Sequence, residues 1–390
     1  MYDVIVSGAG PAGSTCAEVL AKKGFKVALI ERDTNWRKPC AGAVSSRVFK
    51  YFPQLRETDF QKINGICIYS ANYRKLEYSW QGIREPSINV DRLEFDKILQ
   101  EIAIDKGAEL FDKNLSYKFI TRNGKKIGIK TKSPSGNNEF EGKIIVIADG
   151  MGSKLAIKSG LRKKWNIENI GLLKCAILEG DTNLNEEFIN IFFQPYVGYG
   201  WIFPLKNNRF NVGVGTWEEE NVNYNVNNLF KDFLKKNYEQ KILLRKPYKE
   251  FWSASYPIPA TGVLEKSLYG ENIMIIGDAA GFVSPISGEG IHASIVSGFA
   301  AGETAVKALE KGSVVSDTLK AYKQFPNIRK IVRNFKLKKS LVNFFFENSG
   351  SNFSRMLELA ENDKNVKEEV INMFLFNQAP SRELLLNIKS

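Results

Sequence analysis

The 390-residue chain is basic, with 55 lysines and arginines against 43 acidic residues and a net charge of +12, and its 43% hydrophobic content is ordinary for a globular protein. Its length allows two or three domains with a sizeable core, and the absence of an apolar run of about 18 residues argues against a membrane span. A single histidine and four widely spaced cysteines without a CxxC pair argue against a metal centre, so we expect no metal, reduced thiols and a cytoplasmic location.

The first motif is a glycine-rich turn between a predicted strand, residues 2–7, and a predicted helix, residues 11–23. It has the sequence Gly8-Ala9-Gly10-Pro11-Ala12-Gly13. In such a turn the first glycine permits the tight bend, the second allows a pyrophosphate to approach, and the third lets the helix pack closely. The phosphates then meet free N–H groups at the helix N-terminus. Glu31, at the end of the second predicted strand, is placed for an adenosine ribose, which makes a generic glycine turn the weaker interpretation.

Two further pairs of an aspartate and a glycine close predicted strands later in the chain. Asp149-Gly150 follows the apolar run 144–148, and Gly277-Asp278 follows the run 273–276. Three such signatures in this order each contact a different part of an FAD molecule. Together they predict FAD as the cofactor.

The remaining elements predict an α/β protein with an α+β second domain. Asn123-Gly124 and Ser135-Gly136 are hairpin signals, which predict a three-stranded antiparallel meander over residues 115–147, inserted in a Rossmann-like FAD-binding domain. Strand-rich segments near 63–80 and 171–216, with a helical stretch at 222–244, predict a separate antiparallel sheet. We therefore divide the chain into an FAD-binding domain (1–58, 82–165 and 260–324), an antiparallel-sheet substrate domain (59–81 and 166–259) and a helical C-terminal region (325–390).

Helices dominate the chain after the third signature. One runs from Gly288 to about residue 311, and Gly298 and Gly302, four residues apart, are expected to let it lie close to the sheet. The tail from residue 325 is predicted to form three helices and is cationic at its start.

Six of these cations alternate with apolar residues and precede the apolar run 341–346; they are Arg329, Lys330, Arg333, Lys336, Lys338 and Lys339. The pattern fits a solvated helix packed by its apolar side, or a basic amphipathic surface that docks on anionic lipid at the inner face of the cell membrane. No nucleic-acid-binding motif accompanies the positive charge, so we expect no nucleic-acid partner.

Two more motifs carry a resemblance to a known family. Lys38-Pro39-Cys40-Ala41-Gly42 follows the second strand, and Tyr199-Gly200-Trp201-Ile202-Phe203-Pro204 is followed, after eight residues, by Gly213-Val214-Gly215. The FAD signatures with Asp91-Arg92 resemble the p-hydroxybenzoate-hydroxylase-like flavoprotein superfamily. The two added motifs are similar to those of the geranylgeranyl reductase family, and within it to the archaeal digeranylgeranylglycerophospholipid reductases. The resemblance covers roughly residues 1–310; Ala43 stands where the family pattern has glycine, and the tail is not matched.

The resemblance implies an FAD site and a substrate cavity. The FAD contacts, with the glycine turn included, would be Gly8, Gly10, Ala12, Gly13, Glu31, Arg32, Cys40, Ala41, Ala43, Arg92, Leu115, Asp278, Gly288, Gly290 and Ile291. Cys40, Tyr199 and Trp201 would be catalytic, and Phe193, Tyr199, Trp201 and Phe203 would line a polyprenyl pocket. Two plainer interpretations stay open, with Cys40 as a small packing residue and the alternating aromatic residues as an ordinary core stripe.

The implied reaction is FAD-dependent saturation of the C=C bonds of geranylgeranyl chains, in archaeal-type membrane lipids or their precursors, by hydride transfer from reduced FAD. The prenyl lipid is the expected substrate, and NADPH, reduced ferredoxin and a deazaflavin all remain open as electron donor. One rival is an FAD-dependent aromatic monooxygenase or halogenase, since YxWxFP loosely resembles the halogenase WxWxIP motif. The other is a non-enzymatic prenyl-binding carrier, which the intact FAD signatures disfavour.

Overall fold

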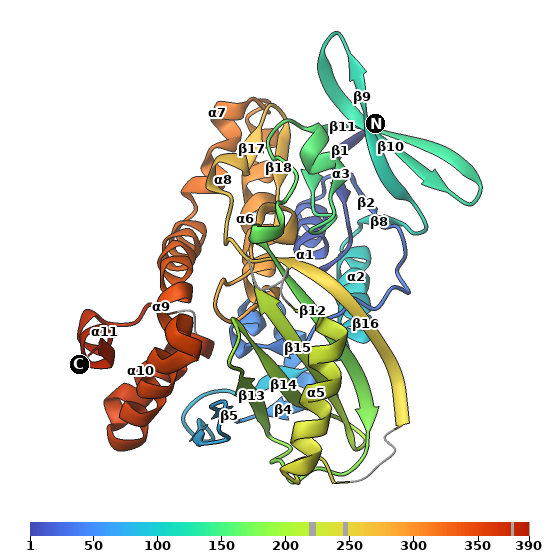
Figure 1. Ribbon diagram of the computed structural model, residues 1–390. Coiled ribbons are helices and arrows are strands. Elements are labelled where there is room, and N and C mark those ends of the chain that lie inside the picture. Colours follow the sequence, from blue (N-terminus) through green and yellow to red (C-terminus); the bar gives the residue numbers. More distant parts are fainter. Residues whose placement is uncertain (218–223, 245–248, 376–377, 390) are drawn as a thin grey trace.

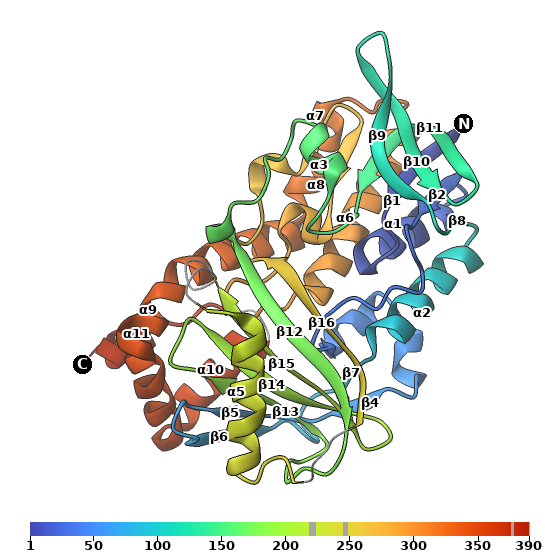
Figure 2. The same cartoon turned by 45° about the vertical axis from the view of Figure 1, so that its right-hand side comes forward.

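The structure, a computed structural model, describes residues 1–217, 224–244, 249–375 and 378–389 (Figure 1). A sheet flanked by helices forms the upper part, a second sheet lies below it, and the C-terminal helices run along one side (Figure 1, Figure 2).

The upper sheet is the parallel core. Its strands follow the order β17-β18-β11-β1-β2-β8, and only β17 and β18 are antiparallel along this path. The strands are β1 (Tyr2–Ser7), β2 (Val27–Ile30), β8 (Glu109–Phe111), β11 (Gly136–Ile147), β17 (Tyr269–Gly270) and β18 (Ile273–Ile275). β1, β2 and the end of β11 consist of buried, mostly Val, Ile and Leu residues, because a parallel sheet is covered by helices on both faces.

The long strand β11 belongs both to an antiparallel meander and to the parallel core. Its first half pairs antiparallel with β10 (Lys125–Ser133), which pairs with β9 (Leu115–Arg122), and its second half joins the parallel core beside β1. This is the predicted meander, and it projects from the core in Figure 1. The predicted Rossmann-like fold with an inserted meander is therefore confirmed.

Helices cover this core, and two of them are pressed together. The helices are α1 (Pro11–Ala21), α2 (Arg92–Asp105), α3 (Lys154–Lys158), α6 (Ile291–Glu310), α7 (Ser316–Leu319) and α8 (Ala321–Gln324). A Cβ at Gly298 would lie 2.2 Å from the carbonyl oxygen of Ala12, and one at Gly302 would lie 2.8 Å from the side chain of Val19. The two glycines thus bring α6 against α1, which corrects our expectation that they bring it against the sheet.

The lower sheet has seven strands in the order β16-β12-β15-β14-β13-β5-β6. They are β5 (Gly65–Tyr69), β6 (Lys75–Ser79), β12 (Ile170–Glu179), β13 (Phe188–Phe193), β14 (Gly198–Leu205), β15 (Arg209–Trp217) and β16 (Lys249–Pro259). β5 and β13 are parallel and the other neighbours antiparallel. Helix α5 (Val226–Glu239) packs on one face through Phe230 and Phe233; the first two residues of the helical stretch predicted at 222–244 lie outside the described residues.

Short elements connect the two layers. β3 (Ala43–Val44), β7 (Ser87–Asn89) and β4 (Gln61–Ile63) form a small sheet, so the start of the segment predicted at 63–80 belongs partly to this sheet. The single-turn helices are η1 (Ser46–Lys50), η2 (Pro53–Glu57), η3 (Ile167–Asn169), η4 (Glu265–Ser267) and η5 (Gly277–Ala280). The residue boundaries of the domains stay predictions.

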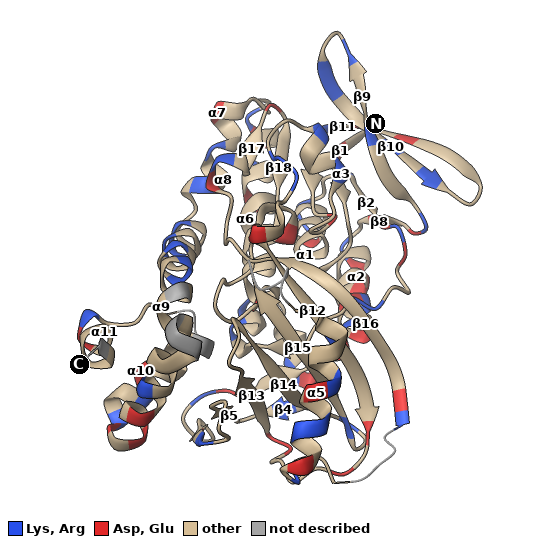
Figure 3. Cartoon of the chain, in the orientation of Figure 1, with Lys and Arg blue, Asp and Glu red and all other residues tan. Residues whose placement is uncertain are grey.

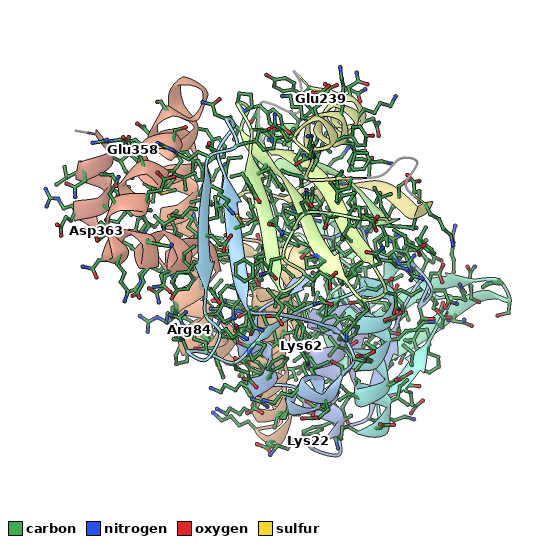
Figure 4. All side chains as sticks on the ribbon, turned by 90° about the horizontal axis from the view of Figure 1, so that it is seen from below. Lys22, Lys62, Arg84, Glu239, Glu358 and Asp363 are labelled. Atoms are coloured by element: carbon green, nitrogen blue, oxygen red, sulfur yellow. The ribbon has the colours of Figure 1, made fainter. Side chains whose placement is uncertain are left out.

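The tail forms the three helices that the sequence predicts, α9 (Pro326–Asn362), α10 (Lys364–Leu375) and α11 (Arg382–Lys389). Helix α9 packs beside the edge strand β6 (Figure 4), and α10 and α11 pack on α9. Nη1 of Arg84, in the loop after β6, donates to Oδ1 of Asn372 of α10 at 3.4 Å. In the described part of the chain no helix is long and apolar enough to cross a membrane.

The basic start of α9 needs a correction. Lys338 is fully buried and donates a hydrogen bond to the carbonyl oxygen of Met373 at 2.7 Å, because its side chain points toward α10. Leu341, Val342 and Phe345 are buried in the core of the lower sheet. The predicted surface of six cations therefore lacks Lys338, and these members of the apolar run serve packing.

Candidate cofactor and substrate site

One cavity of about 480 Å³ lies between the carboxyl ends of the parallel strands and the lower sheet. Its lining comes from the glycine turn, the loop after β2, the start of α2, the Gly277–Gly290 region and strands β12 to β16. Of the predicted FAD contacts, fourteen line it: Gly8, Gly10, Ala12, Glu31, Arg32, Cys40, Ala41, Ala43, Arg92, Leu115, Asp278, Gly288, Gly290 and Ile291. The folding thus brings these scattered positions to one place.

The three glycines of the turn have different surroundings. Gly8 has φ +104°, and a Cβ there would lie 2.4 Å from the carbonyl oxygen of Ala148. A Cβ at Gly13 would lie 1.8 Å from the carbonyl oxygen of Gly8, so Gly13 serves helix packing and is not part of the lining found among the described residues. A Cβ at Gly10 would meet no described atom within 4 Å and would point into open space, which leaves room for a phosphate.

The carboxylate of Glu31 is fixed at the edge of the cavity by main-chain N–H groups. Ala9 donates to it at 2.7 Å, Arg32 at 2.9 Å and Asp33 at 3.2 Å. Burial raises the pKa of Glu31, and these backbone hydrogen bonds oppose the rise. The carboxylate is thereby oriented before any ligand arrives.

Buried polar atoms without a hydrogen-bond partner in the cavity lining indicate whether a nucleotide fits there. Oδ1 of Asp149, Oγ of Ser116 and Nε1 of Trp217 are buried and have no hydrogen-bond partner within the described part of the chain. Burial raises the pKa of Asp149 to about 6. Acceptors and donors left unpaired in a cavity are costly unless a ligand satisfies them, and FAD carries hydroxyl, carbonyl and ring-nitrogen groups of both kinds. The cavity fits FAD.

A buried ion pair crosses the cavity, and the sequence analysis did not predict this pairing. Nζ of Lys38 donates to Oδ2 of Asp278, a residue 240 positions away. Both side chains line the cavity and are at most 20% exposed. Burial lowers the pKa of Lys38, but the Asp278 carboxylate outweighs it and the net shift is upward. Only the Lys-Pro-Cys motif marked Lys38, which had no predicted role.

The Cys40 loop is held between the two layers. Cys40 is half-buried, and its carbonyl oxygen accepts a hydrogen bond from Nδ2 of Asn211 at 2.8 Å. Arg92, predicted to meet the pyrophosphate, makes a bidentate pair with Asp96 at 3.0 and 2.8 Å. Burial lowers the pKa of Arg92, whereas Asp96 and the nearby Cys40 thiol raise it above its ordinary range.

The opposite wall is aromatic and aliphatic. Tyr199, Trp201 and Phe203 alternate along β14 and line the cavity with Ile189 and Ile191 of β13. The hydroxyl of Tyr199 donates to the carbonyl oxygen of Ser287 at 2.5 Å, and Nε1 of Trp201 donates to Oδ1 of Asn211 at 2.8 Å. Both polar atoms are thus used within the protein, and the rings contribute apolar atoms to the lining.

The predicted role of Phe193 as a substrate contact needs a correction. Its ring stacks on Phe353 of α9, with centroids 3.6 Å apart, and it is absent from the lining found among the described residues. Phe193 does share a face with Ile191, as strand alternation requires. It stands at the end of β13, however, where α9 covers the sheet.

Comparison with known proteins places the chain in a family. Residues 1–330 match the FAD binding domain family. Digeranylgeranylglycerophospholipid reductase 2 of Methanococcoides burtonii is 30% identical over 364 residues, which cover 90% of this chain and 86% of the relative. Digeranylgeranylglycerophospholipid reductase 1 of Methanosphaera stadtmanae is 31% identical, with 82% of this chain and 79% of the relative covered.

Solved structures share the fold. A geranylgeranyl bacteriochlorophyll reductase-like protein of Thermoplasma acidophilum superimposes with a TM-score of 0.82 at 23% identity, covering 99% of this chain and 95% of that one. The flavin-dependent brominase Bmp2 superimposes with a TM-score of 0.76 at 19% identity, covering 100% and 97%. The sequence relatives go further than the fold: the chain belongs to the FAD binding domain family and, within it, to the family of the digeranylgeranylglycerophospholipid reductases.

Proposed function

We propose that this protein is an FAD-dependent reductase that saturates the C=C bonds of geranylgeranyl chains, in archaeal-type membrane lipids or their precursors. The observation that carries the proposal is the apolar wall of β13 and β14, which lines the same cavity as the predicted FAD contacts. Such a wall suits a polyprenyl chain and disfavours small charged acids. The named activity of the relatives agrees with this chemistry.

Bound and reduced FAD supplies a hydride, and the chain's own residues must shape the rest of the reaction. A trisubstituted alkene has no carbonyl group to withdraw electrons, so protonation and hydride transfer must be closely coupled. Positive charge then develops at the tertiary carbon. The ring faces of Trp201 and Tyr199 can ease it by cation–π interaction, worth about 1–2 kcal/mol each in a dry site.

The hydrogen bonds of the aromatic wall reduce the number of candidate proton donors. The Tyr199 hydroxyl already donates a hydrogen bond to the carbonyl oxygen of Ser287, and burial raises the pKa of Tyr199 well above the ordinary value. We therefore assign Tyr199 to holding the Ser287 loop and to presenting its ring. Cys40, which lines the cavity, is the group we propose to donate a proton or to hold a water that does so.

The test is an anaerobic turnover assay with chemically reduced enzyme. Geranylgeranyl diphosphate and a digeranylgeranyl glycerophospholipid are offered separately, and mass spectrometry counts the hydrogens added. Saturation of either lipid supports the proposal and identifies the preferred headgroup. If neither is reduced, and the enzyme instead consumes oxygen with an aromatic substrate, the monooxygenase or halogenase alternative replaces it. The reaction also needs a reducing partner, which we propose to be NADPH, reduced ferredoxin or a deazaflavin.

A membrane lipid substrate also calls for contact with a membrane, and we propose that the start of α9 provides it. Arg329, Lys330 and Arg333 are exposed there, and Lys336 is 65% exposed although it pairs with Glu265. Figure 3 shows the lysines and arginines along this part of α9 in blue. Each basic residue near an anionic surface contributes about 1 kcal/mol. The protein would then lie at the cytoplasmic face of the membrane without spanning it.

Vesicle sedimentation tests this contact with a matched control. Changing Arg329, Lys330 and Arg333 to glutamate should abolish salt-sensitive binding to anionic vesicles. The matched control changes three exposed meander lysines, Lys118, Lys125 and Lys132, to glutamate, which alters the net charge equally. The meander projects at the upper right of Figure 1, whereas α9 runs along the left side. Equal loss in both variants would reduce the effect to overall charge, and no loss in either would remove α9 as the docking surface.

A further inference from the structure

Asn211 connects two motifs that lie far apart in the sequence. It stands on β15, is 4% exposed and does not belong to the lining found in the described part of the chain. Its Oδ1 accepts from Nε1 of Trp201, and its Nδ2 donates to the carbonyl oxygen of Cys40, each at 2.8 Å. One buried amide therefore links the aromatic wall to the loop that carries the thiol.

The Cys40 loop depends on such external contacts because it has little regular structure of its own. The only strand in it, β3, has two residues. Gly42 has φ +89°, and its carbonyl oxygen accepts from the N–H of Val90 at 3.0 Å, which holds the loop on the α2 side. The bond from Asn211 to Cys40 is the corresponding contact on the side of the lower sheet.

We propose that Asn211 is a positioning residue, which fixes the Cys40 thiol at one place relative to the rings of β14. It lies behind the lining found among the described residues and acts through the main chain of Cys40 and the indole of Trp201. Without it, the Cys40 carbonyl and the Trp201 N–H lose their partner, and the loop gains freedom to turn the thiol. The effect on alkene reduction rests on the proposed function, whereas the effect on the thiol does not.

The experiment measures alkylation of Cys40 by iodoacetamide in the FAD-loaded enzyme. Cys40 is the half-exposed thiol, and Cys16, Cys67 and Cys175 are buried. Asn211→Leu removes both hydrogen bonds, and Asn211→Asp keeps the acceptor for Trp201 but loses the donor to Cys40. The matched control is Asn190→Leu on β13, because Asn190 is 2% exposed and bonds only the nearby carbonyl of Phe188 among the hydrogen bonds found for its side chain.

Both Asn211 variants should change the alkylation rate of Cys40 about fivefold, the factor that one neutral hydrogen bond contributes. Turnover of the prenyl lipid should fall while FAD content, the rate of flavin reduction and KM stay as in the wild type. Asn190→Leu should lower the melting temperature without changing the alkylation rate. Wild-type alkylation in both Asn211 variants, or the same change in Asn190→Leu, would overturn the proposal.

A second variant covers the case in which the Asn211 variants do not fold. Trp201→Phe removes the indole donor and leaves Asn211 in place, so it should also change Cys40 alkylation; unchanged alkylation there would refute the coupling. If alkylation responds as expected but no prenyl lipid is reduced even by the wild type, the proposed function fails and the positioning role stands.

Discussion

The neighbouring glycines Gly10 and Gly13 allow FAD binding and folding to be perturbed separately. Gly10 has φ −75° and ψ −175°, which alanine adopts freely, and a Cβ there meets no described atom within 4 Å. Gly10→Ala should therefore leave the apoprotein unchanged, or stabilise it by about 0.5 kcal/mol through the lost entropy of the unfolded chain. The added methyl group instead occupies the space in which we expect a phosphate.

Gly13→Ala should act in the opposite way. A Cβ placed 1.8 Å from the carbonyl oxygen of Gly8 forces α1 away from the turn, because both atoms belong to rigid backbone. Overpacking of this kind costs about 3 kcal/mol or more. For Gly10→Ala, losing one charge-assisted bond between an N–H group and a phosphate, about 1.5–3 kcal/mol, weakens FAD binding roughly 10- to 100-fold.

The assay uses protein stripped of FAD. Denaturant unfolding reports the stability of the apoprotein, and quenching of flavin fluorescence reports the Kd for FAD. Gly10→Ala should change only the Kd, and Gly13→Ala should lower the stability first. An FAD affinity of Gly10→Ala within about twofold of the wild type would refute the reasoning, because no phosphate could then lie against the turn.

Three further perturbations follow from the site and the tail. Cys40→Ser should keep FAD and slow alkene reduction far more than flavin reduction, and stopped-flow kinetics measures both rates. Serine at each of the three buried cysteines should not slow alkene reduction. Turnover of Cys40→Ser equal to that of the wild type would make Cys40 a packing residue. Asp278→Ala should lose FAD more readily than Glu31→Ala during gel filtration, because it also leaves the buried ammonium group of Lys38 unpaired; the reverse order would contradict this. Burial lowers the pKa of Lys338 from 10.5 to about 7, so the native state is penalised by up to about 4 kcal/mol at pH 7, and the penalty fades as pH rises toward 10.5. Lys338→Met should therefore be more stable than the wild type at pH 7, and its free energy of unfolding should lack this rise with pH. Urea unfolding at pH 7 and 9.5 measures both effects, and the same change of stability with pH in the two proteins would contradict the prediction.

Features of the site that depend on local backbone geometry could be predicted from the sequence. The positions of Gly8, Gly13 and Glu31 follow from backbone geometry within one strand–turn–helix unit, and the structure places all three as that geometry requires, while the ribose contact of Glu31 stays a prediction. The strand alternation likewise predicted the face shared by Tyr199 and Trp201. These features depend on residues close together in the sequence, which is why the sequence alone could predict them.

Features that depend on distant segments could not be predicted. Alternation places Phe193 on the same face as the cavity wall, but only the path of α9 decides that Phe353 covers it. The amphipathic pattern of α9 does not say which of its cations points at α10, and for this reason it cannot predict that Lys338 is buried. The pairing of Lys38 with Asp278 joins residues 240 positions apart, for which no periodicity exists.

The two halves of the site are synthesised at different times, because β18 and the site residues after it come late in the chain. The glycine turn emerges at once, but β18 reaches β11 only after residue 275, and Asp278, Gly288 and Gly290 come later still. At typical elongation rates the N-terminal half of the site waits on the order of ten seconds or more for its counterpart. Loading of the cofactor is therefore a step of the nearly finished chain, and the end of the apolar face at Phe193 stays uncovered until α9 has been made. A shortage of flavin would prolong the time that the completed chain spends with an empty site, and FAD supply during expression should therefore raise the soluble yield.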